Sequence, residues 1–520
     1  MRPQENLAFL RKHLWIALGL AFVFRALTAY FNYGPQSVDD YDHGLIPAWE
    51  LLRGIPLNLP EWRSPLLVWT LYPFAKLASL VGLTVSFDIF RVIMLALGVF
   101  SLWGIWSFGG YLARNPSFAL TTDRLGAPTP LEAERRRLWL VPLYLLSVHF
   151  ILSFAVTRAF GEVIAATLVL IAVLWMEESL DHMDKGRARL RFFVGASLLG
   201  IACLYRYQVG VLGIGMAGYL LATRRFREFG WLAAGGLVAL LLEGGKDLLF
   251  GRTFLETLLA YLNVNKNGAI EWSNQPWYNT WTTVMLMFFL PFSAPFFIGL
   301  KKTIRFERVV WILILLFTAI HSMIPHKEER FLYPILPLTL VLLGRLWARA
   351  WGTKFEKFFF RPFIGLIMIA GLAVATISNS QSGEYEPLLR AARLSGAARL
   401  PGSVLIWDNE SLLEKSFFRE RLVVAPVEYQ IHPGLPAIED LERLRQRGQS
   451  LLVVTSNEEK LPAFREWRAG IPAGLDCGEL DRIQSIGDRM LYRSNPKYNT
   501  RRKPTWIYQC FWPSDAADEH

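Results

Sequence analysis

The chain has 520 residues, of which 53% are hydrophobic and only 19% are charged, and this composition excludes an ordinary soluble globular protein. The formal net charge of +11 would suit a nucleic-acid-binding protein, but Lys and Arg gather in short segments between long apolar runs. Such clusters are typical of the cytoplasmic loops of a membrane protein, so nucleic acid is not an expected partner. We therefore predict a polytopic α-helical membrane protein.

Apolar runs of membrane-spanning length recur from His13 to about Ser378 and then cease. Each covers roughly 17–25 residues, enough to cross a hydrocarbon core of ~30 Å. The first run lacks the small-residue cleavage site of a secretory signal, so we interpret it as a spanning helix. We predict a multi-span domain over residues 1–380 and a soluble α/β domain over residues 381–520.

The first outer segment, predicted at 31–63, carries a concentration of acidic residues in "SVDDYDHGLIPAWELLRG" at 37–54. After Asp40, apolar residues recur at helical spacing, namely Leu45, Ile46, Trp49 and Leu52. This spacing predicts an amphipathic helix on the membrane interface, ending near Arg53, with Asp39 at its N-terminus. A carboxylate there is kept ionised by the helix dipole, as a general base requires. The alternative is a solvated acidic loop.

Clusters of Lys and Arg predict the orientation. Those at 301–308 and 345–361 indicate cytoplasmic loops by the positive-inside rule. The connection between them, which holds "HKEER" at 326–330, is then expected on the outer face, together with the C-terminal domain.

The alternation of inner and outer segments along the chain requires an odd number of membrane crossings between residues 64 and 113. Two apolar runs occur there, at 64–83 and 88–112. Either one of them is re-entrant, or the count is off by one further along the chain.

The stretch "HKEERFLYP" at 326–334, with "DD" at 39–40 after the first span, resembles the lumenal mannosyltransferases that use dolichyl-phosphate-mannose in N-glycan and GPI-anchor assembly. Further matching segments follow in the family's order, namely "EWRS" at 61–64, "TRAFGE" at 157–162 and "NVNKNGAIEWSNQPWYNTW" at 263–281. The resemblance covers roughly residues 14–345. It departs where the family commonly has P-D-E and this chain has Val38-Asp39-Asp40.

The resemblance implies a GT-C-like membrane fold and an inverting transfer of a sugar, expected to be mannose, from a polyprenyl-phosphate carrier. Such a transfer needs a base for the acceptor hydroxyl and positive charge for the departing phosphate. Asp39 is the expected base by its match to the family's first acid, and Asp40 is the alternative.

The donor phosphate is expected to contact His326, Lys327 and Arg330, because Arg suits bidentate phosphate contact and Lys supplies a point charge. Glu328 and Glu329 are then partners that orient these cations. The alternative is a salt-bridged loop at the level of the lipid headgroups.

Other candidates lie at predicted outer ends of spans. Three arginines are expected to bind phosphate or headgroups, or only to extend to the interface, namely Arg63, Arg158 and Arg206. Trp277 and Tyr278 either stack on a sugar or belong to the interfacial aromatic residues. An ion-paired set with a largely structural role is expected at Glu243, Lys246 and Asp247.

We expect no metal and no cofactor. The acidic cluster at Asp39, Asp40 and Asp42 offers oxygen ligands to a divalent cation, but a leaving group with one phosphate needs no metal to neutralise it. The sequence shows no Gly-rich nucleotide-phosphate motif, which favours a lipid-linked donor. The expected partners are a polyprenyl-phosphate sugar donor, a glycan or glycolipid acceptor and membrane lipids.

A transporter or flippase of lipid-linked saccharides is the alternative function. Transporters place ionisable residues near the bilayer midplane in repeated, broken helices, whereas here charge lies in outer connections and no repeat is visible. The compact loops favour a bacterial inner membrane over the ER membrane.

The C-terminal domain alternates β-rich and helical segments. Strands are predicted at 403–407, 451–456, 489–494 and 504–510, and a helix at 437–448. Cys477 and Cys510 share this domain, and an oxidising outer compartment favours a disulfide between them. Two unpaired thiols are the alternative, and Cys203 lies in an apolar span.

Overall fold

The computed structural model describes residues 3–34, 36, 41–83, 86–114, 132–180, 183, 185–268, 275–287, 308–351, 357–358, 361–378, 386, 404–408, 430–433, 435, 437–446, 451–457, 461–470, 476–494, 496 and 502–512. The predicted catalytic acids Asp39 and Asp40 lie outside these residues. The chain divides into two units, which are described separately. Unit 1 consists of Met1–Ala29, Leu57–Leu71 and Met94–Thr376, and unit 2 of Tyr30–Pro56, Tyr72–Ile93 and Ile377–His520.

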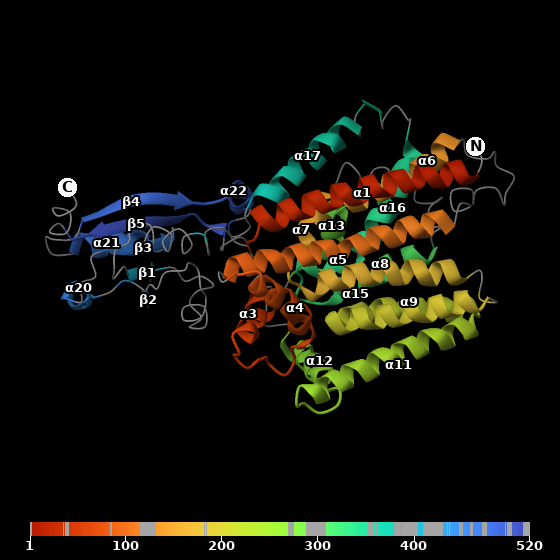
Figure 1. Cartoon of the computed structure of the whole chain (residues 1–520), viewed down its shortest axis with the longest axis horizontal. Helices are drawn as coiled ribbons and strands as arrows, with labels where there is room; N and C mark the ends of the chain where they lie inside the picture. Colours follow the sequence, from red (N-terminus) through yellow and green to blue (C-terminus); the bar gives the residue numbers. More distant parts are fainter. Residues whose placement is uncertain are drawn as a thin grey trace. The chain divides into compact units, whose positions relative to one another are not determined.

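Helices make up most of the described part of unit 1, and some of them extend into unit 2 (Figure 1). Their bounds are α1 (Pro3–Phe31), α4 (Leu66–Leu80), α5 (Ser86–Arg114), α6 (Glu132–Val148), α7 (Phe150–Ala155), α8 (Gly161–Leu180), α9 (Gly186–Tyr205), η4 (Tyr207–Val209), α10 (Gly210–Ala222), α11 (Phe226–Leu249), α12 (Glu256–Gly268), α13 (Tyr278–Met287), α15 (Arg308–Met323), η5 (Glu329–Ile335), α16 (Leu336–Ala350) and α17 (Arg361–Ile377).

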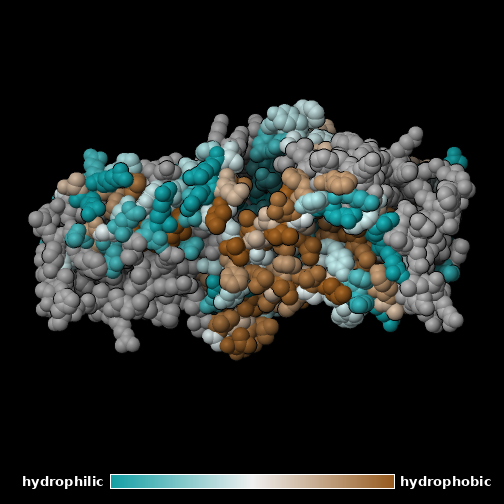
Figure 2. Space-filling view, turned by 90° about the horizontal axis from the view of Figure 1, so that it is seen from above, coloured by the Kyte–Doolittle hydropathy of each residue, from teal (hydrophilic) through white to brown (hydrophobic). Residues whose placement is uncertain are grey.

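Among the described residues, five stretches are long and apolar enough to cross a membrane, namely Leu7–Phe31, Phe87–Arg114, Gly161–Leu180, Gly186–Tyr205 and Glu329–Ala348. Hydrophobic side chains gather on the surface over the helical region (Figure 2). A soluble protein would bury these side chains, whereas a bilayer solvates them. The predicted polytopic α-helical membrane protein is confirmed.

The two apolar runs between residues 64 and 113 form helices of unequal length. α4 has 15 residues, about 22 Å at 1.5 Å per residue, whereas α5 has 29 residues, about 44 Å. Only α5 exceeds the ~30 Å of a hydrocarbon core. The length of α4 therefore suits the re-entrant interpretation, and the number of crossings stays a prediction.

α8 is deeply buried, and α9 runs beside it, followed by α11 (Figure 1). Small residues allow these close approaches. A Cβ atom added to Gly235 of α11 would lie 2.6 Å from the Cβ of Ala196 in α9. A Cβ atom on Gly161 would lie 2.4 Å from the carbonyl oxygen of Tyr205. Both positions need glycine because a side chain would push the neighbouring helix away.

The predicted amphipathic helix after Asp40 forms as η1 (Tyr41–Leu45) followed by α3 (Ile46–Leu52). Its apolar residues do not face lipid, because Leu45, Ile46 and Trp49 are no more than 2% exposed. The expectation that its apolar face lies on the membrane is therefore wrong, because this face is covered by protein.

Unit 2 contains the predicted C-terminal α/β domain, with a sheet of order β2-β1-β3-β5-β4. The bounds are β1 (Val404–Asp408), β2 (Gln430–Pro433), α20 (Ile438–Gln446), β3 (Leu451–Asn457), α21 (Leu461–Gly470), β4 (Asp476–Ile483), α22 (Ile486–Ser494) and β5 (Thr505–Phe511). β1 pairs in parallel with β2 and β3, and β5 pairs antiparallel with β3 and β4. Phe464 and Tyr508 stack within its apolar core.

The predicted disulfide is confirmed, since Cys477 and Cys510 are bonded and lie opposite each other on β4 and β5. The strand predicted at 489–494 is wrong, because these residues belong to α22. The backbone N–H of Asp488 donates to Ser485 Oγ (3.1 Å), which is an N-cap contact. The Met, Leu and Arg residues that follow are good helix formers.

Candidate functional site

The charged segment "HKEER" is packed into unit 1 rather than solvated. It follows α15 and leads into η5, which packs against α8. Lys327 is 7% exposed and Arg330 is 5% exposed, whereas Glu329 is exposed. Charged side chains this deeply buried need partners.

Glu328 is the partner that orients Arg330. Its Oε2 lies 2.6 Å from Arg330 Nε, and its Oε1 accepts a hydrogen bond from Arg330 Nη2 at 2.9 Å. The same Oε1 lies 3.0 Å from His326 Nε2. The second acid, Glu329, forms no ion pair with any described residue. Of the two neighbouring carboxylates, only Glu328 therefore pairs with described residues, a difference that the sequence does not reveal.

A second carboxylate–guanidinium pair lies beside the first. Arg206, which follows α9, is 3.1 Å from Glu162 Oε1 at the start of α8. Phe331 connects the pairs, because the Arg206 guanidinium lies 4.8 Å and that of Arg330 5.6 Å from its ring centroid. The structure therefore brings Arg206 together with "HKEER".

Lys327 differs from the two arginines in its surroundings. Its Nζ donates to the carbonyl oxygens of Gln275 (3.0 Å) and Ile324 (2.5 Å). No carboxylate among the described residues lies within ion-pair distance of this amine. Burial lowers the pKa of Lys327, because its ammonium loses hydration. A buried cation held only by carbonyl dipoles favours an anionic ligand.

A pocket opens beside these residues and within unit 1. It is lined by His326, Lys327, Glu328, Glu329, Phe331, Leu332, His321 of α15, and Asn279, Thr280 and Thr283 of α13. Its interior of about 10 Å³ holds about one water molecule.

Trp277 and Tyr278 stand at the start of α13 and are 67% and 55% exposed. Their rings contact each other edge to face, with centroids 6.0 Å apart. Neither ring lines the pocket, although the next residue, Asn279, does. The structure is compatible with both interpretations of the aromatic pair.

Arg158 and Arg63 each place the guanidinium over an aromatic ring other than Phe331. Arg158 is completely buried, with its guanidinium 4.2 Å from the ring centroid of Phe154. Arg63 lies 4.2 Å over the ring of Trp62. A fully buried guanidinium is not a residue extending to the interface, so Arg158 is an internal structural or binding element.

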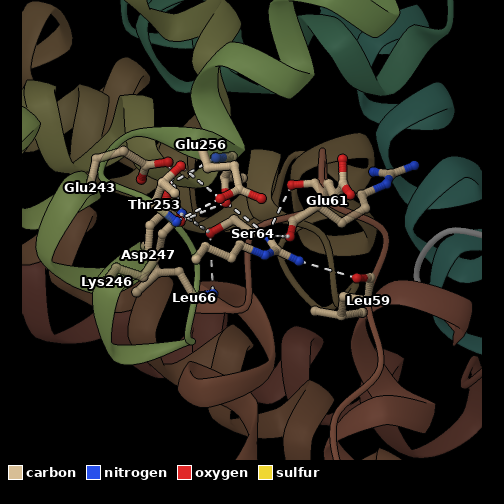
Figure 3. A network of polar contacts seen from close by, with 12 residues as sticks. Leu59, Glu61, Ser64, Leu66, Glu243, Lys246, Asp247, Thr253 and Glu256 are labelled. Atoms are coloured by element: carbon tan, nitrogen blue, oxygen red, sulfur yellow. Dashed lines mark hydrogen bonds and ion pairs between the residues drawn. The ribbon is translucent and has the colours of Figure 1, made fainter.

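The segment "EWRS" is held by a network of polar contacts from α11 and the turn after it (Figure 3). Lys246 Nζ donates to Ser64 Oγ (3.2 Å) and lies 2.8 Å from Glu243 and 3.0 Å from Asp247. Asp247 in turn accepts two hydrogen bonds from Thr257, at 2.6 and 3.0 Å. The predicted ion-paired set is confirmed, and it positions the R-S segment.

Arg252 completes this network from the turn between α11 and α12. Its guanidinium donates to the carbonyl oxygens of Leu59 (3.1 Å), Pro60 (3.1 Å), Glu61 (2.9 Å) and Arg63 (3.0 Å). All four acceptors belong to the main chain. The path of residues 59–63 is therefore fixed by one side chain.

The described residues contain no group of three or more His, Cys, Asp or Glu arranged to hold a metal ion. The acidic cluster around Asp39 falls outside the described residues, so this observation does not extend to it. The expectation of metal-independent chemistry stays a prediction.

Residues 61–392 match the model of the Alg9-like mannosyltransferase family. The chain belongs to this family. The chain is similar to GPI mannosyltransferase 3 of Eremothecium gossypii. The two are 29% identical over 38% of this chain and 36% of that protein. Mannosyltransferase APTG1 of Arabidopsis thaliana is 25% identical over 38% of this chain and 30% of that protein. The chain thus spans about a third of the length of these relatives.

The fold of this Alg9-like chain is shared with a solved membrane protein structure. ArnT from Cupriavidus metallidurans bound to undecaprenyl phosphate superimposes with a TM-score of 0.56 over 96% of this chain and 98% of that chain. The apo state of the same enzyme gives 0.54 over 97% and 98%. Identity is 14% in both comparisons, so they establish the fold alone. The predicted GT-C-like fold is confirmed.

Sequence reasoning missed several residues of this Alg9-like site. Phe160 and Phe331 support the guanidinium groups, with Phe160 5.0 Å from that of Arg330. Glu162 was present only inside the motif "TRAFGE", and its partner Arg206 is 44 residues further along the chain. A motif can indicate that an acid matters, but tertiary packing decides which cation it meets.

Proposed function

We propose that this Alg9-like chain is an inverting glycosyltransferase that moves mannose from a polyprenyl-phosphate carrier to a glycan or glycolipid acceptor. The supporting observation is Lys327, a buried cation with only carbonyl partners among the described residues, beside two arginines over one phenyl ring. An anionic phosphate is the ligand that such a set would stabilise. The undecaprenyl phosphate of the ArnT structure supports a lipid-linked phosphate.

In this mechanism the carrier phosphate leaves with the electrons of the bond to the sugar, while the acceptor hydroxyl attacks from the opposite face. Lys327, Arg330 and Arg206 stabilise the negative charge that grows on the phosphate. Glu328 and Glu162 hold the two guanidinium groups in place. Asp39 takes the proton of the acceptor hydroxyl, a role that rests on the family resemblance.

The reaction is proposed on the periplasmic or lumenal face of the membrane, without a metal. A leaving group with one phosphate is neutralised by the three side-chain cations alone. The relatives from Eremothecium gossypii and Arabidopsis thaliana are eukaryotic proteins, and the preference for a bacterial inner membrane stays a prediction.

A transfer assay in detergent tests this function. The purified chain is incubated with polyprenyl-phosphate-mannose labelled in the sugar and with a lipid and glycan extract of its host, and labelled product is separated by chromatography. Transfer without a sealed membrane is expected, and excess EDTA should leave the rate unchanged. Transport of the donor only in sealed vesicles, with no labelled product in detergent, would support a flippase instead.

A further inference from the structure

Helix α22 is attached to the residue that follows the apolar helix α17. α17 ends at Ile377, and the next residue, Ser378, accepts a hydrogen bond from the backbone N–H of Gly487 at 2.8 Å. Ser378 Oγ also donates to Ser485 Oγ at 3.1 Å. These contacts, all within unit 2, hold the N-terminus of α22 directly at the end of α17.

One side of α22 packs onto the domain, and the opposite side is apolar and exposed. Asp488 is buried and lies 2.6 Å from Arg502. Ile486 and Met490, one helical turn apart, are 66% and 63% exposed, and Leu491 is 45% exposed. The exposed apolar side chains thus form a stripe along the helix.

Basic residues flank this stripe. Arg489 and Arg493 are exposed and one turn apart, and with Arg482 of β4 they line an open cleft of about 310 Å³. Its other lining residues are Gln484, Tyr492 and Pro504. Among the described residues, no carboxylate forms an ion pair with Arg489 or Arg493. The cleft therefore combines a positive charge with polar donors.

We propose that α22 is an interfacial helix: its apolar stripe enters the outer leaflet, and the arginine cleft binds the phosphate of an anionic lipid headgroup. Amphipathic helices with Arg on one face bind in this way, about 5–10 Å into the headgroup region. α17 is apolar, and its Ile369 and Ile377 are 72% and 65% exposed, as residues that face lipid would be.

The bilayer is favoured over a protein partner because α22 is held at Ser378, the residue after the apolar helix α17, and because positive charge lies beside its apolar stripe. Anionic lipids attract each nearby Arg or Lys appreciably, and the attraction decreases within one Debye length. An exposed apolar stripe in bulk water would instead be an aggregation hazard.

Depth measurements on the full-length protein in nanodiscs test the apolar part. Cys203→Ala removes the free thiol, and Met490→Cys is labelled with an environment-sensitive fluorophore; Glu442→Cys, exposed on α20, serves as the matched control. Lipids spin-labelled on the acyl chain should quench the label at 490 several-fold more than the label at 442. Ile486→Cys, one turn away, should behave like Met490→Cys. Equal quenching at 490 and 442 would overturn the proposal.

Headgroup selectivity tests the arginine cleft. Quenching at position 490 is compared between spin-labelled phosphatidylglycerol and spin-labelled phosphatidylcholine, and phosphatidylglycerol should quench more strongly. Arg489→Gln with Arg493→Gln should lower this preference by about fivefold for each Arg. Arg465→Gln with Arg468→Gln, which removes two exposed charges from α21, should leave it unchanged.

Two further outcomes would contradict the proposal. If inorganic phosphate changes the fluorescence in detergent while the two lipids quench equally, the cleft binds a soluble anion. If both double variants lower the preference equally, net charge rather than the cleft is responsible.

Discussion

Glu328 binds Arg330, two residues later, through both carboxylate oxygens, at 2.6 Å from Nε and 2.9 Å from Nη2. Glu328→Gln keeps the shape but removes the charge that orients the guanidinium. We expect transfer to decrease by about tenfold or more, the value of one charge-assisted hydrogen bond. Steady-state kinetics with varied donor concentration would measure the effect.

Glu329→Gln is the matched control for that experiment. This neighbouring acid is exposed and forms no ion pair with a described residue. Glu329 also lines the pocket, so its variant should lose some transfer activity but less than Glu328→Gln. Equal losses in the two variants would show that the charge of the segment matters and the pairing does not.

Asp39→Asn tests the proposed base. The protein should remain folded and inserted in the membrane, while transfer decreases by a factor of at least ~10² because the acceptor hydroxyl loses its proton acceptor. Single-turnover rates at saturating donor concentration would isolate the chemical step. Normal turnover in this variant together with an inactive Asp40→Asn would assign the base to Asp40.

Arg330→Ala and Lys327→Ala test the donor site. Each removes a cation from the proposed phosphate contacts, so the KM for the donor and the Kd for undecaprenyl phosphate should rise by about tenfold. Lys266→Ala, on an exposed side chain of α12, is the control. Normal donor kinetics with reduced protein yield would show that "HKEER" stabilises the fold and does not bind the donor.

Loss of the Cys477–Cys510 bond should weaken the C-terminal domain. The bond joins residues 33 apart, and chain-entropy reasoning assigns such a link about 3–4 kcal/mol. Cys477→Ala with Cys510→Ala should therefore make this domain more sensitive to limited proteolysis. Unchanged cleavage rates would mean that the sheet holds these strands without the covalent link.

The disulfide was predictable because it depended on few facts: two cysteines, one small domain and an oxidising compartment. The helix at 486–494 was not, because "RMLYRS" has apolar residues at spacings that suit a strand as well as a helix. The deciding signal was Ser485 with Asp488 three residues later, a capping pattern upstream of the ambiguous letters.

The candidate site was predictable as a list of residues and not as an arrangement. "HKEER" and Arg206 could both be identified at the outer ends of spans. Their meeting over Phe331 depends on the packing of η5 against α8, a contact between segments far apart in the chain. The prediction that the helix at 41–52 lies on the membrane was wrong for the same reason. Periodicity identifies an apolar face but does not show what covers it.

Arg252 holds residues 59–63 through carbonyl oxygens alone. Recognition of this kind is indifferent to side-chain identity, because every amino acid presents the same carbonyl. The contacts of Arg252 therefore do not depend on which side chains stand at Leu59, Pro60 and Glu61. Position 252, in contrast, requires Arg, because no other side chain offers a planar fork of five N–H donors.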